Sequence, residues 1–345
     1  MLQVKAERLH RVATALFEAA GTPSDITKDV VDILIASNLA GHDSHGVQLI
    51  PSYMRFVKEG RVRPDARPTV LEETASTALV SGHWGWGQLT AAFGADVAIR
   101  KARETRVSVV AMVECNHIGR QGEYVERASA AGLAMIATLG SGSPEGGNTA
   151  PFGGRRGALG TNPWSMGIPG GRQQPNVLLD FATTVVAGNK VAVARAKGEM
   201  LPAGAIQDKD GNPTVDPAAL REGGTMLPFG AHKGYALAVC AELFGNVVAP
   251  AYRFPGPGRF GGTLFITLDP AMFAPPAEYR AEVDRVLGRV KSVPPAPGFQ
   301  EVLLPGEPEA RARKLRGEQG VPLPEATWEA LKNSGGELGV DVEAL

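Results

Sequence analysis

The sequence has few cysteines, no excess of charge of either sign and no basic run. Cys115 and Cys240 are the two cysteines among 345 residues, which is too few for a disulfide framework or a zinc ribbon and fits a reducing compartment. The 35 lysines and arginines are balanced by 36 acidic residues, with a formal net charge of -1. The electrostatic footprint of a nucleic-acid-binding protein is therefore missing, and we expect a cytoplasmic protein that binds no nucleic acid.

The sequence also has no long uninterrupted apolar run. Its most hydrophobic late stretch, residues 234–248, is interrupted by Glu242 and Asn246, which favours a buried helix over a membrane span. The first 21 residues are typical of an amphipathic helix with charges throughout, and no apolar segment precedes a cleavage-type site. We expect neither secretion nor membrane insertion, and the 43% hydrophobic content allows a sizeable core.

The usual fingerprints of a nucleotide site are missing as well. There is no Walker A sequence, and the literal G-x-G-x-x-G match at residues 256–261 follows a loop and precedes an expected strand. That order is the reverse of the one that places a pyrophosphate at a helix N-terminus. The Gly-rich residues 140–147 follow a strand, but no helix follows them, and we expect a flexible loop there unless a ligand or a neighbour holds it.

What is present is a helical start followed by a mixed pattern. Helices are expected in the first 60 residues, ending with one near 52–59, and the proline-rich RVRPDARP that follows is our first domain boundary. The polar helices of the last 45 residues could pack back on this start. Between them we predict strands at 77–80, 107–113, 133–139, 164–168, 177–181 and 263–268, and helices at 88–105, 122–131, 232–244 and 277–290.

Two histidines lie where the second helix ends, in the stretch GHDSHGV. Ser24 or Asp25 is the expected N-cap of that helix. A rigid helix end suits a proton-transferring imidazole, whose partner atom must lie in a defined direction. Two other interpretations stay open: His45 caps the last carbonyls of the helix, or His42 and His45 are half of a metal site. No Cys or His cluster elsewhere completes such a site, and we expect no metal.

Three further patches concentrate polar groups. His117, in the sequence NHIG, follows the 107–113 strand, at the kind of strand end where sites are assembled, or is a histidine satisfied by backbone. Residues 160–163 and 180–183 place hydroxyls, an amide and a carboxylate at the ends of adjacent strands, or form turns and a helix N-cap. Residues 229–234 open a helix, where free N–H groups and Lys233 could meet a phosphate or a carboxylate.

Taken together, GHDSHG, NHIG, APFGG, LGTNP, LDFAT and HKGYALA occur in the order and rough spacing of the type 2 malate/L-lactate dehydrogenase family, and the resemblance covers nearly the whole chain. GHDSHGVQLIPSY and LLPGE are most similar to its bacterial hydroxycarboxylate dehydrogenase branch. The resemblance implies an oxidoreductase that uses NAD or NADP and interconverts 2-oxo and 2-hydroxy acids. The alternatives are a cyclic imino acid reductase of the same family and a catalytically silent, ligand-binding relative.

The resemblance also implies a fold. It is an α/β (α+β) fold of non-Rossmann type, in which residues 71–294 form a cofactor-binding domain with a mostly antiparallel sheet. Residues 1–70 with 295–345 form a helical domain from both termini. The protein is expected to be a homodimer with the site near the subunit interface.

Site residues follow from the same resemblance. His45 and His117 match the acid/base candidates of the family, with Ser44 beside the first. Many members carry an arginine after SHG that can clamp a substrate carboxylate; here those places are Leu49 and Ser52, so Arg55 and Arg120 are candidates to replace it. The residues expected to contact the cofactor are Gly119, Arg120, Gln121, Thr161, Leu179, Asp180, Phe181, Ala182, Thr183, His232, Lys233, Leu304, Pro305, Gly306 and Glu307.

Overall fold

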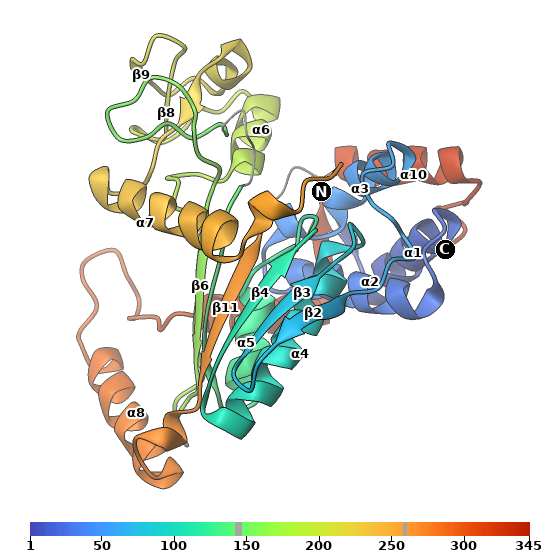
Figure 1. The fold of residues 1–345 in the computed structure, drawn as a ribbon. Helices are drawn as coiled ribbons and strands as arrows, with labels where there is room; N and C mark the ends of the chain where they lie inside the picture. The colour runs from blue at the N-terminus through green and yellow to red at the C-terminus, as the bar shows by residue number, and fades with distance from the viewer. Residues whose placement is uncertain (142–146, 258–260) are drawn as a thin grey trace.

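The computed structural model describes residues 1–141, 147–257 and 261–345, and it is a mixed α/β protein (Figure 1). The fold class expected from the sequence is therefore confirmed at this level. Residues 142–146 of the Gly-rich loop and residues 258–260 of the G-x-G-x-x-G match lie outside the described residues. Within the described ranges, no helix is both long and apolar enough to cross a bilayer.

A seven-stranded sheet forms the centre of the molecule, in the order β2-β3-β4-β11-β5-β6-β7. Neighbouring strands are antiparallel except β3 and β4, which are parallel and are joined by the crossover helix α4 (Gly87–Thr105). The strands are β2 (Thr69–Glu73), β3 (Thr77–Ser81), β4 (Val107–Val113), β5 (Ala134–Leu139), β6 (Trp164–Ile168), β7 (Val177–Phe181) and β11 (Thr263–Leu268).

The late strand β11 completes the sheet by inserting between β4 and β5. Phe265 lies opposite Val110 on one side and Ala137 on the other, and all three are fully buried. Helices α4 and α5 (Gly122–Ala130) pack on the sheet and share this apolar core. Because β3 and β4 run in parallel, the loops that follow them, residues 82–86 and 114–121, leave the sheet at the same edge.

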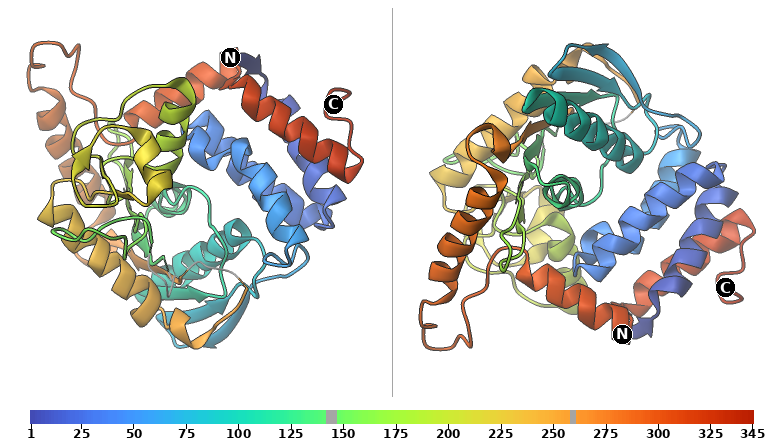
Figure 2. Two further views of the ribbon diagram at one scale, coloured as in Figure 1. Left: turned by 90° about the horizontal axis from the view of Figure 1, so that it is seen from above. Right: turned by 90° about the horizontal axis from the view of Figure 1, so that it is seen from below.

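The two ends of the chain share a second hydrophobic core (Figure 2). The short strand β1 (Leu2–Val4) pairs with β12 (Val321–Leu323), so the last residues return to the first helices. The division into two domains with the boundaries given above stays a prediction. The helices of this part are α1 (Ala6–Ala19), α2 (Ser24–Leu39), α3 (Ile50–Lys58), α9 (Glu307–Gln319) and α10 (Glu325–Leu338), with 3-10 turns at Asp43–His45 and Val47–Leu49.

The expected N-cap of α2 is wrong. Pro23 is the N-cap, and no side chain caps the helix. The fixed φ of proline, here -56°, leads the chain directly into the first turn. Asp25 instead accepts two hydrogen bonds from the Arg67 guanidinium, at 2.6 and 3.0 Å.

A smaller unit lies above the large sheet in Figure 1. Its three short strands pair in the order β10-β8-β9, and together with α6 (Gly188–Lys197) they enclose a third apolar cluster. The remaining helices are α7 (His232–Leu243) and α8 (Pro276–Lys291). Helix α7 continues as a π-helical turn over Phe244–Val248. The remaining short elements are β8 (Ile206–Gln207), β9 (Pro213–Thr214), β10 (Thr225–Met226) and 3-10 turns at Pro217–Glu222, Ala251–Arg253 and Pro270–Met272.

Candidate functional site

A cavity of about 610 Å³ lies where the loop after β4, the ends of β5 and β7 and the turn after α2 meet. Its size is in the range of small-molecule and cofactor sites. Both His45 and His117 line it, together with Arg120, Asp180 and the start of α6. The cavity therefore brings together residues from separate polar patches of the sequence.

The turn that carries His45 is held by Asn38, near the end of α2. The Asn38 amide donates to Asp43 at 2.7 Å and accepts from the Val47 N–H at 2.9 Å. A side chain on Gly46 would overlap the Asn38 amide, since a Cβ there would lie 2.1 Å from it, so the turn requires glycine. Ser44 Oγ lies 2.9 Å from His45 Nδ1. Within the described structure, the His45 side chain contacts Ser44 and the cavity, and the helix-capping interpretation is wrong.

His117 is held from the opposite direction by a loop that packs closely on α4. The Asn116 amide donates to the carbonyls of Trp84 and Gly85, both at 2.9 Å. A Cβ on Gly87 would lie only 2.2 Å from the Asn116 carbonyl oxygen, so the first turn of α4 must approach this loop as bare backbone. The rings of His117 and His45 stack with 5.7 Å between centroids, which places two imidazoles side by side in the cavity.

Burial shifts the pKa of both histidines downward, but unequally. It lowers the pKa of His117 to about 3, with a further contribution from the nearby His45. Burial also lowers the pKa of His45, but the Asp180 carboxylate opposes that shift. The imidazolium of His117 is strongly disfavoured at neutral pH, whereas His45 has a carboxylate that favours its protonated form.

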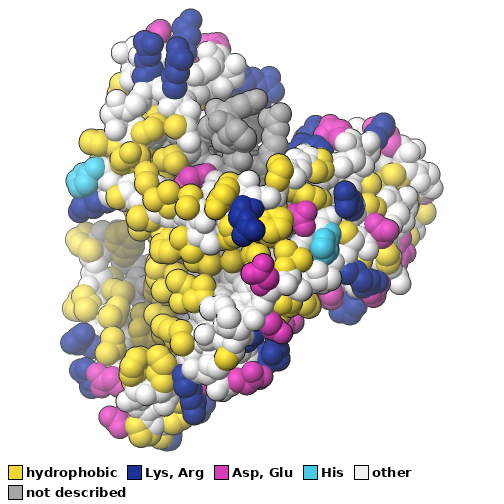
Figure 3. Space-filling view, in the orientation of Figure 1, with side chains coloured by type: hydrophobic (Ala, Val, Ile, Leu, Met, Phe, Trp, Pro, Cys, Tyr) yellow, Lys and Arg dark blue, Asp and Glu magenta, His cyan; other side chains and the backbone are white. Residues whose placement is uncertain are grey.

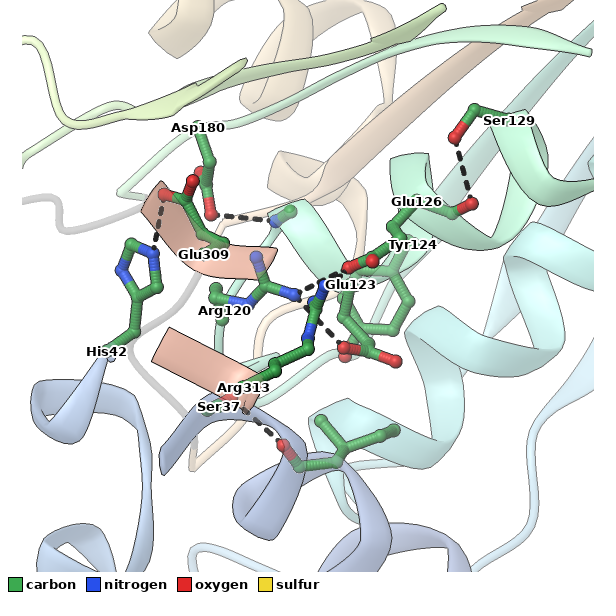
Figure 4. A network of polar contacts seen from close by, with 12 residues as sticks. Ser37, His42, Arg120, Glu123, Tyr124, Glu126, Ser129, Asp180, Glu309 and Arg313 are labelled. Carbon is green, nitrogen blue, oxygen red and sulfur yellow. Dashed lines mark hydrogen bonds and ion pairs between the residues drawn. The ribbon is translucent and has the colours of Figure 1, made fainter. Parts of the chain in front are cut away.

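Arg120 and Asp180 form the charged wall of the cavity (Figure 4). Arg120 is 3% exposed, and its Nη2 donates to Glu123 at 3.2 Å and to Glu126 at 3.0 Å. The Asp180 carboxylate accepts from the Gly122 N–H at 2.8 Å and from Ser165 at 2.5 Å. These bonds tie β7 to the start of α5.

Helix α9 closes the same region from outside through polar contacts. Arg313 pairs with Glu126, and Glu309 lies 3.2 Å from His42 Nε2 (Figure 4). Arg316 binds the Asp43 carboxylate with two contacts, at 2.6 and 3.0 Å. The turn that carries His45 is thus fastened to the C-terminal part of the chain.

Several buried polar atoms on the cavity wall lack a hydrogen-bond partner within the described part of the chain. They are Nε of Arg120, both amide atoms of Gln121 and Oδ1 of Asn162. These side chains are between 1% and 3% exposed. Because buried polar groups are nearly always hydrogen-bonded in native proteins, these atoms are the ones that a bound ligand would satisfy.

The structure gathers most of the expected site residues, but not all. The cavity is lined by Ser44, His45, His117, Gly119, Arg120, Gln121, Thr161, Asp180, Phe181 and Ala182. Leu179 and Thr183 flank this wall: Leu179 pairs with Met166, and Thr183 binds the Thr161 carbonyl at 2.8 Å. Leu304, Pro305, Gly306 and Glu307 lie on the other end of β7, where the Pro305 carbonyl accepts from Leu178 at 3.1 Å.

One expected contact stays a prediction, and one expected placement needs correction. His232 and Lys233 begin α7 and are exposed, and neither is among the residues that line the cavity. Residues 180–183 do not open a helix: Asp180 and Phe181 end β7, and α6 begins only at Gly188. The LDFAT sequence is apolar and branched enough to continue a strand, and the pairing of β7 with β6 decides its conformation.

The candidates for the missing arginine differ sharply. Arg55 is 62% exposed on α3, lies 3.7 Å from Glu59 and does not line the cavity, whereas Arg120 does. Leu49 packs against the helical core. Among the described residues, no group of three His, Cys, Asp or Glu side chains is arranged to hold a metal ion.

Four residues near the site were missed in the sequence. Tyr53 hydrogen-bonds to His117, and Gln88 hydrogen-bonds to Tyr53. Lys190 lines the cavity. Glu242 accepts from the Ser141 N–H at 2.9 Å and from Asn162 at 2.6 Å, which holds two cavity segments against α7. A tyrosine on the apolar face of α3, and a single glutamate within the apolar α7, were the available signals.

Comparison with known proteins shows the family. Residues 4–332 match the family model described as malate/L-lactate dehydrogenase. The chain is 33% identical to hydroxycarboxylate dehydrogenase B of Escherichia coli strain K12, over 99% of this chain and 95% of that protein. It is also 33% identical to the L-sulfolactate dehydrogenase of Methanocaldococcus jannaschii, over 99% and 98%.

Solved structures give the same result. The sulfolactate dehydrogenase structure from Methanocaldococcus jannaschii superposes with a TM-score of 0.89 at 32% identity, covering 99% of both chains. The delta1-piperideine-2-carboxylate reductase from Pseudomonas syringae superposes with a TM-score of 0.82 at 26% identity, covering 97% of this chain and 100% of that one. These matches define an oxidoreductase that acts on 2-hydroxy acids. The chain belongs to the malate/L-lactate dehydrogenase family, as the motifs predicted.

Proposed function

We propose that this protein interconverts a 2-oxo acid and a 2-hydroxy acid with NAD or NADP, and that the reaction takes place in the cavity between His45 and His117. The observation that carries the proposal is the set of buried polar atoms without partners on Arg120, Gln121 and Asn162, beside two stacked histidines. When bound, the dinucleotide supplies or accepts the hydride.

The residues of the cavity wall fit such a cofactor. The Gln121 amide offers both the N–H groups of its nitrogen and its acceptor oxygen, which complements the carboxamide of a nicotinamide. Thr161 and Ala182 line the cavity beside it. The sheet that bears this wall is mostly antiparallel, and the Gly-rich strand-to-helix turn of a Rossmann site is missing from the sequence. Both features support a cofactor domain of non-Rossmann type.

Proton transfer falls to the histidines. The reduction of a carbonyl requires a proton for its oxygen, and the reverse reaction requires a base for the hydroxyl proton. His45 and His117 are the imidazoles that line the cavity, and His42 lies nearer to Glu309. Ser44 Oγ, which lies 2.9 Å from His45 Nδ1, orients the His45 ring.

Arg120 is the proposed anchor of the substrate carboxylate. Its Nη2 is occupied by Glu123 and Glu126, while its Nε has no partner within the described structure. The single N–H on Nε can donate a charge-assisted hydrogen bond to a carboxylate. With Leu49 in place of a second guanidinium, a dicarboxylate would bury a charge without a partner. We therefore propose a preference for monocarboxylic 2-oxo acids with larger apolar side chains.

A homodimer is also proposed. Apart from His232, Lys233 and Glu242, helix α7 consists of apolar and small residues. Leu243 at its end and Val247 and Val248 in its continuation are each more than half exposed. Hydrophobic side chains gather in this region of the surface (Figure 3). Helix α8 buries none of its residues. A helix that is hydrophobic all round is normally covered, and a second copy of the chain would cover it.

Light scattering should give a dimer, and Val247→Glu should shift it to monomer; a monomeric wild type would contradict the proposal.

A substrate panel tests the function. NADH and NADPH oxidation is followed with pyruvate, phenylpyruvate, oxaloacetate and a cyclic imino acid under one set of conditions. The expected order of kcat/KM places phenylpyruvate and pyruvate above oxaloacetate. Turnover of the cyclic imino acid alone would favour the reaction named for the Pseudomonas relative. Cofactor binding without any turnover would indicate a silent, ligand-binding relative. A clear preference for oxaloacetate would show that another cation completes the clamp.

A further inference from the structure

Three buried groups from separate elements form a chain of hydrogen bonds that ends on His117. The Gln88 amide nitrogen, on α4, lies 2.8 Å from the Tyr53 hydroxyl, on α3. The same hydroxyl lies 2.7 Å from Nδ1 of His117. Gln88 is fully buried and Tyr53 is 3% exposed, so water does not compete for these groups.

The direction of the hydrogen bonds follows from counting donors and acceptors. With the Gln88 N–H donating to the Tyr53 oxygen, the Tyr53 proton points to His117 Nδ1, which accepts it. The Gly119 N–H points to the same Nδ1 at 3.4 Å. The opposite direction would turn an Nδ1–H against the Gly119 N–H and would leave the Tyr53 proton without an acceptor. If the Gln88 amide were turned round to accept that proton, both N–H protons of the amide would lose their acceptor instead. The first arrangement leaves one unsatisfied atom, Oε1 of Gln88, and is therefore favoured.

We propose that Tyr53, oriented by Gln88, is a positioning residue that keeps neutral His117 in the tautomer with its proton on Nε2. A neutral imidazole carries one N–H, so an accepting Nδ1 requires the proton on Nε2. His117 then donates a hydrogen bond to the substrate oxygen and does not exchange a proton with it. This inference rests on the proposed function and assigns separate roles to its two histidines.

With these roles, protons and electrons balance in both directions of the reaction. In reduction, a bound reduced dinucleotide would supply the hydride to the carbonyl carbon, and the oxygen would gain negative charge. The His117 Nε2–H stabilises that charge, and protonated His45 gives its proton to the oxygen and becomes neutral. In oxidation, neutral His45 takes the hydroxyl proton, and the hydride would pass with its electron pair from the carbon to a bound oxidised dinucleotide. The hydrogen bond from His117 then weakens. A neutral histidine used to polarise a carbonyl is an established pattern in enzymes.

The surroundings are consistent with this division. Burial raises the pKa of the Tyr53 phenol, so its proton stays available to His117 at any ordinary pH. The pKa of His117 is low, which keeps the ring neutral. Burial also lowers the pKa of His45, but there the Asp180 carboxylate opposes the shift and favours the protonated form.

The test reads the tautomer directly. The full-length protein, labelled with ¹⁵N-histidine and free of substrate, is measured by long-range ¹H–¹⁵N NMR near neutral pH, and the His117 signals are assigned by their loss in His117→Gln. We expect a protonated Nε2 and a bare Nδ1. A protonated Nδ1 in the wild type overturns the proposal.

Matched variants then test the part played by Tyr53. Tyr53→Phe removes the hydroxyl but keeps the ring that packs near Trp86, at 5.8 Å between centroids. We expect intermediate ¹⁵N shifts of His117, as both tautomers exchange. Tyr124→Phe is the control, because Tyr124 is equally buried and its hydroxyl donates to the backbone carbonyl of Ile118. Gln88→Met should act like Tyr53→Phe, and it provides a second variant if the first folds poorly.

Kinetics complete the test. In Tyr53→Phe we expect kcat to fall roughly two- to tenfold, the size of one net hydrogen bond, with the KM for the dinucleotide nearly unchanged. Unchanged His117 shifts in both Tyr53→Phe and Gln88→Met overturn the proposal. A wild type that shows the expected tautomer response but reduces no 2-oxo acid would contradict the proposed function and leave the effect of Tyr53 on His117 supported.

Discussion

The two histidines of the cavity are held by different kinds of force. On the His117 side, formed by Tyr53, Gln88, Asn116 and His117, neutral groups bond to one another inside the protein. On the His45 side, the turn at Asp43–His45 is fastened to α9.

Helix α9 itself buries none of its residues and is attached mainly through charged groups. Salt and pH weaken charged contacts, whereas they leave buried neutral bonds nearly unchanged. The site therefore combines a rigid histidine with one whose support responds to the solution.

The largest expected effect separates the two histidines chemically. His45→Ala should lower kcat by roughly 10²- to 10⁴-fold, because the group that exchanges the proton is lost. His117→Ala should cost less, roughly 10- to 100-fold, because one hydrogen bond to the substrate oxygen is lost. Steady-state kinetics with the best 2-oxo acid measures both, and dinucleotide affinity should stay similar. A larger loss for His117 would exchange the two roles, and near wild-type turnover in both variants would show that histidine-mediated proton transfer is wrong.

Next in size is the loss of the proposed carboxylate anchor. Arg120→Met should lower kcat/KM for a 2-oxo acid by roughly 10- to 100-fold, the size of a hydrogen bond to a charged group. The control is Arg313→Met, because Arg313 contacts the same Glu126 but does not line the cavity. It should change kcat/KM by less than about twofold. Equal losses in the two variants would mean that Glu126, rather than the guanidinium of Arg120, is what the site needs.

A smaller effect concerns the attachment of the His45 turn. Arg316 makes two contacts with Asp43, and the two side chains are 16% and 33% exposed. Arg316→Met should lower the free energy of unfolding by about 1–2 kcal/mol in dilute buffer and by less in concentrated salt.

Urea titrations at two salt concentrations measure this effect. Arg285→Met on α8 is the control, since the Arg285–Glu282 pair is about 60% exposed and should contribute little. A salt-independent loss in Arg316→Met would show that the contact with Asp43 is not mainly electrostatic.

The smallest expected effect is a pH dependence of the free energy of unfolding, caused by the contact between His42 and Glu309 on the His45 side. The hydrogen bond from His42 holds the pKa of Glu309 below its usual value, with Arg120 also contributing. A carboxyl whose pKa is lowered by folding stabilises the protein above its unfolded pKa, and this contribution is lost as the pH falls through the folded value.

Wild type should therefore lose more stability between neutral pH and about pH 4 than Glu309→Gln does. Glu337→Gln, at an exposed position on α10, should follow wild type. Parallel curves of stability against pH for wild type and Glu309→Gln would show that the contact between His42 and Glu309 does not contribute to the pH dependence.

Much of the secondary structure could be predicted from the sequence. The strands at 107–113 and 263–268 and the helix at 88–105 have the expected type and nearly the expected bounds. Local patterns carry that information, because alternation and helical periodicity reflect the neighbours along the chain. The N-cap of α2 was wrong for the opposite reason: Asp25 is recruited by Arg67, 42 residues away.

The candidate site was predicted in part. His45 and His117 were chosen from their positions at element ends and from the family motifs, and both line one cavity. Arg55 and Arg120 were equivalent candidates in the sequence. The structure separates them because α3 turns Arg55 outward, while the loop after β4 turns Arg120 inward.

The sequence by itself determined that the chain is a mixed α/β protein, where most of its longer strands and helices lie, and to which family it belongs. The tertiary structure alone decided which side chains meet. Tyr53 reaches His117 across 64 residues, and Arg313 reaches Glu126 across 187. Such contacts depend on how helices cross the sheet and on where the chain's end returns, and local patterning of residues carries no information about either. For this reason the support of each histidine became visible only in the folded protein.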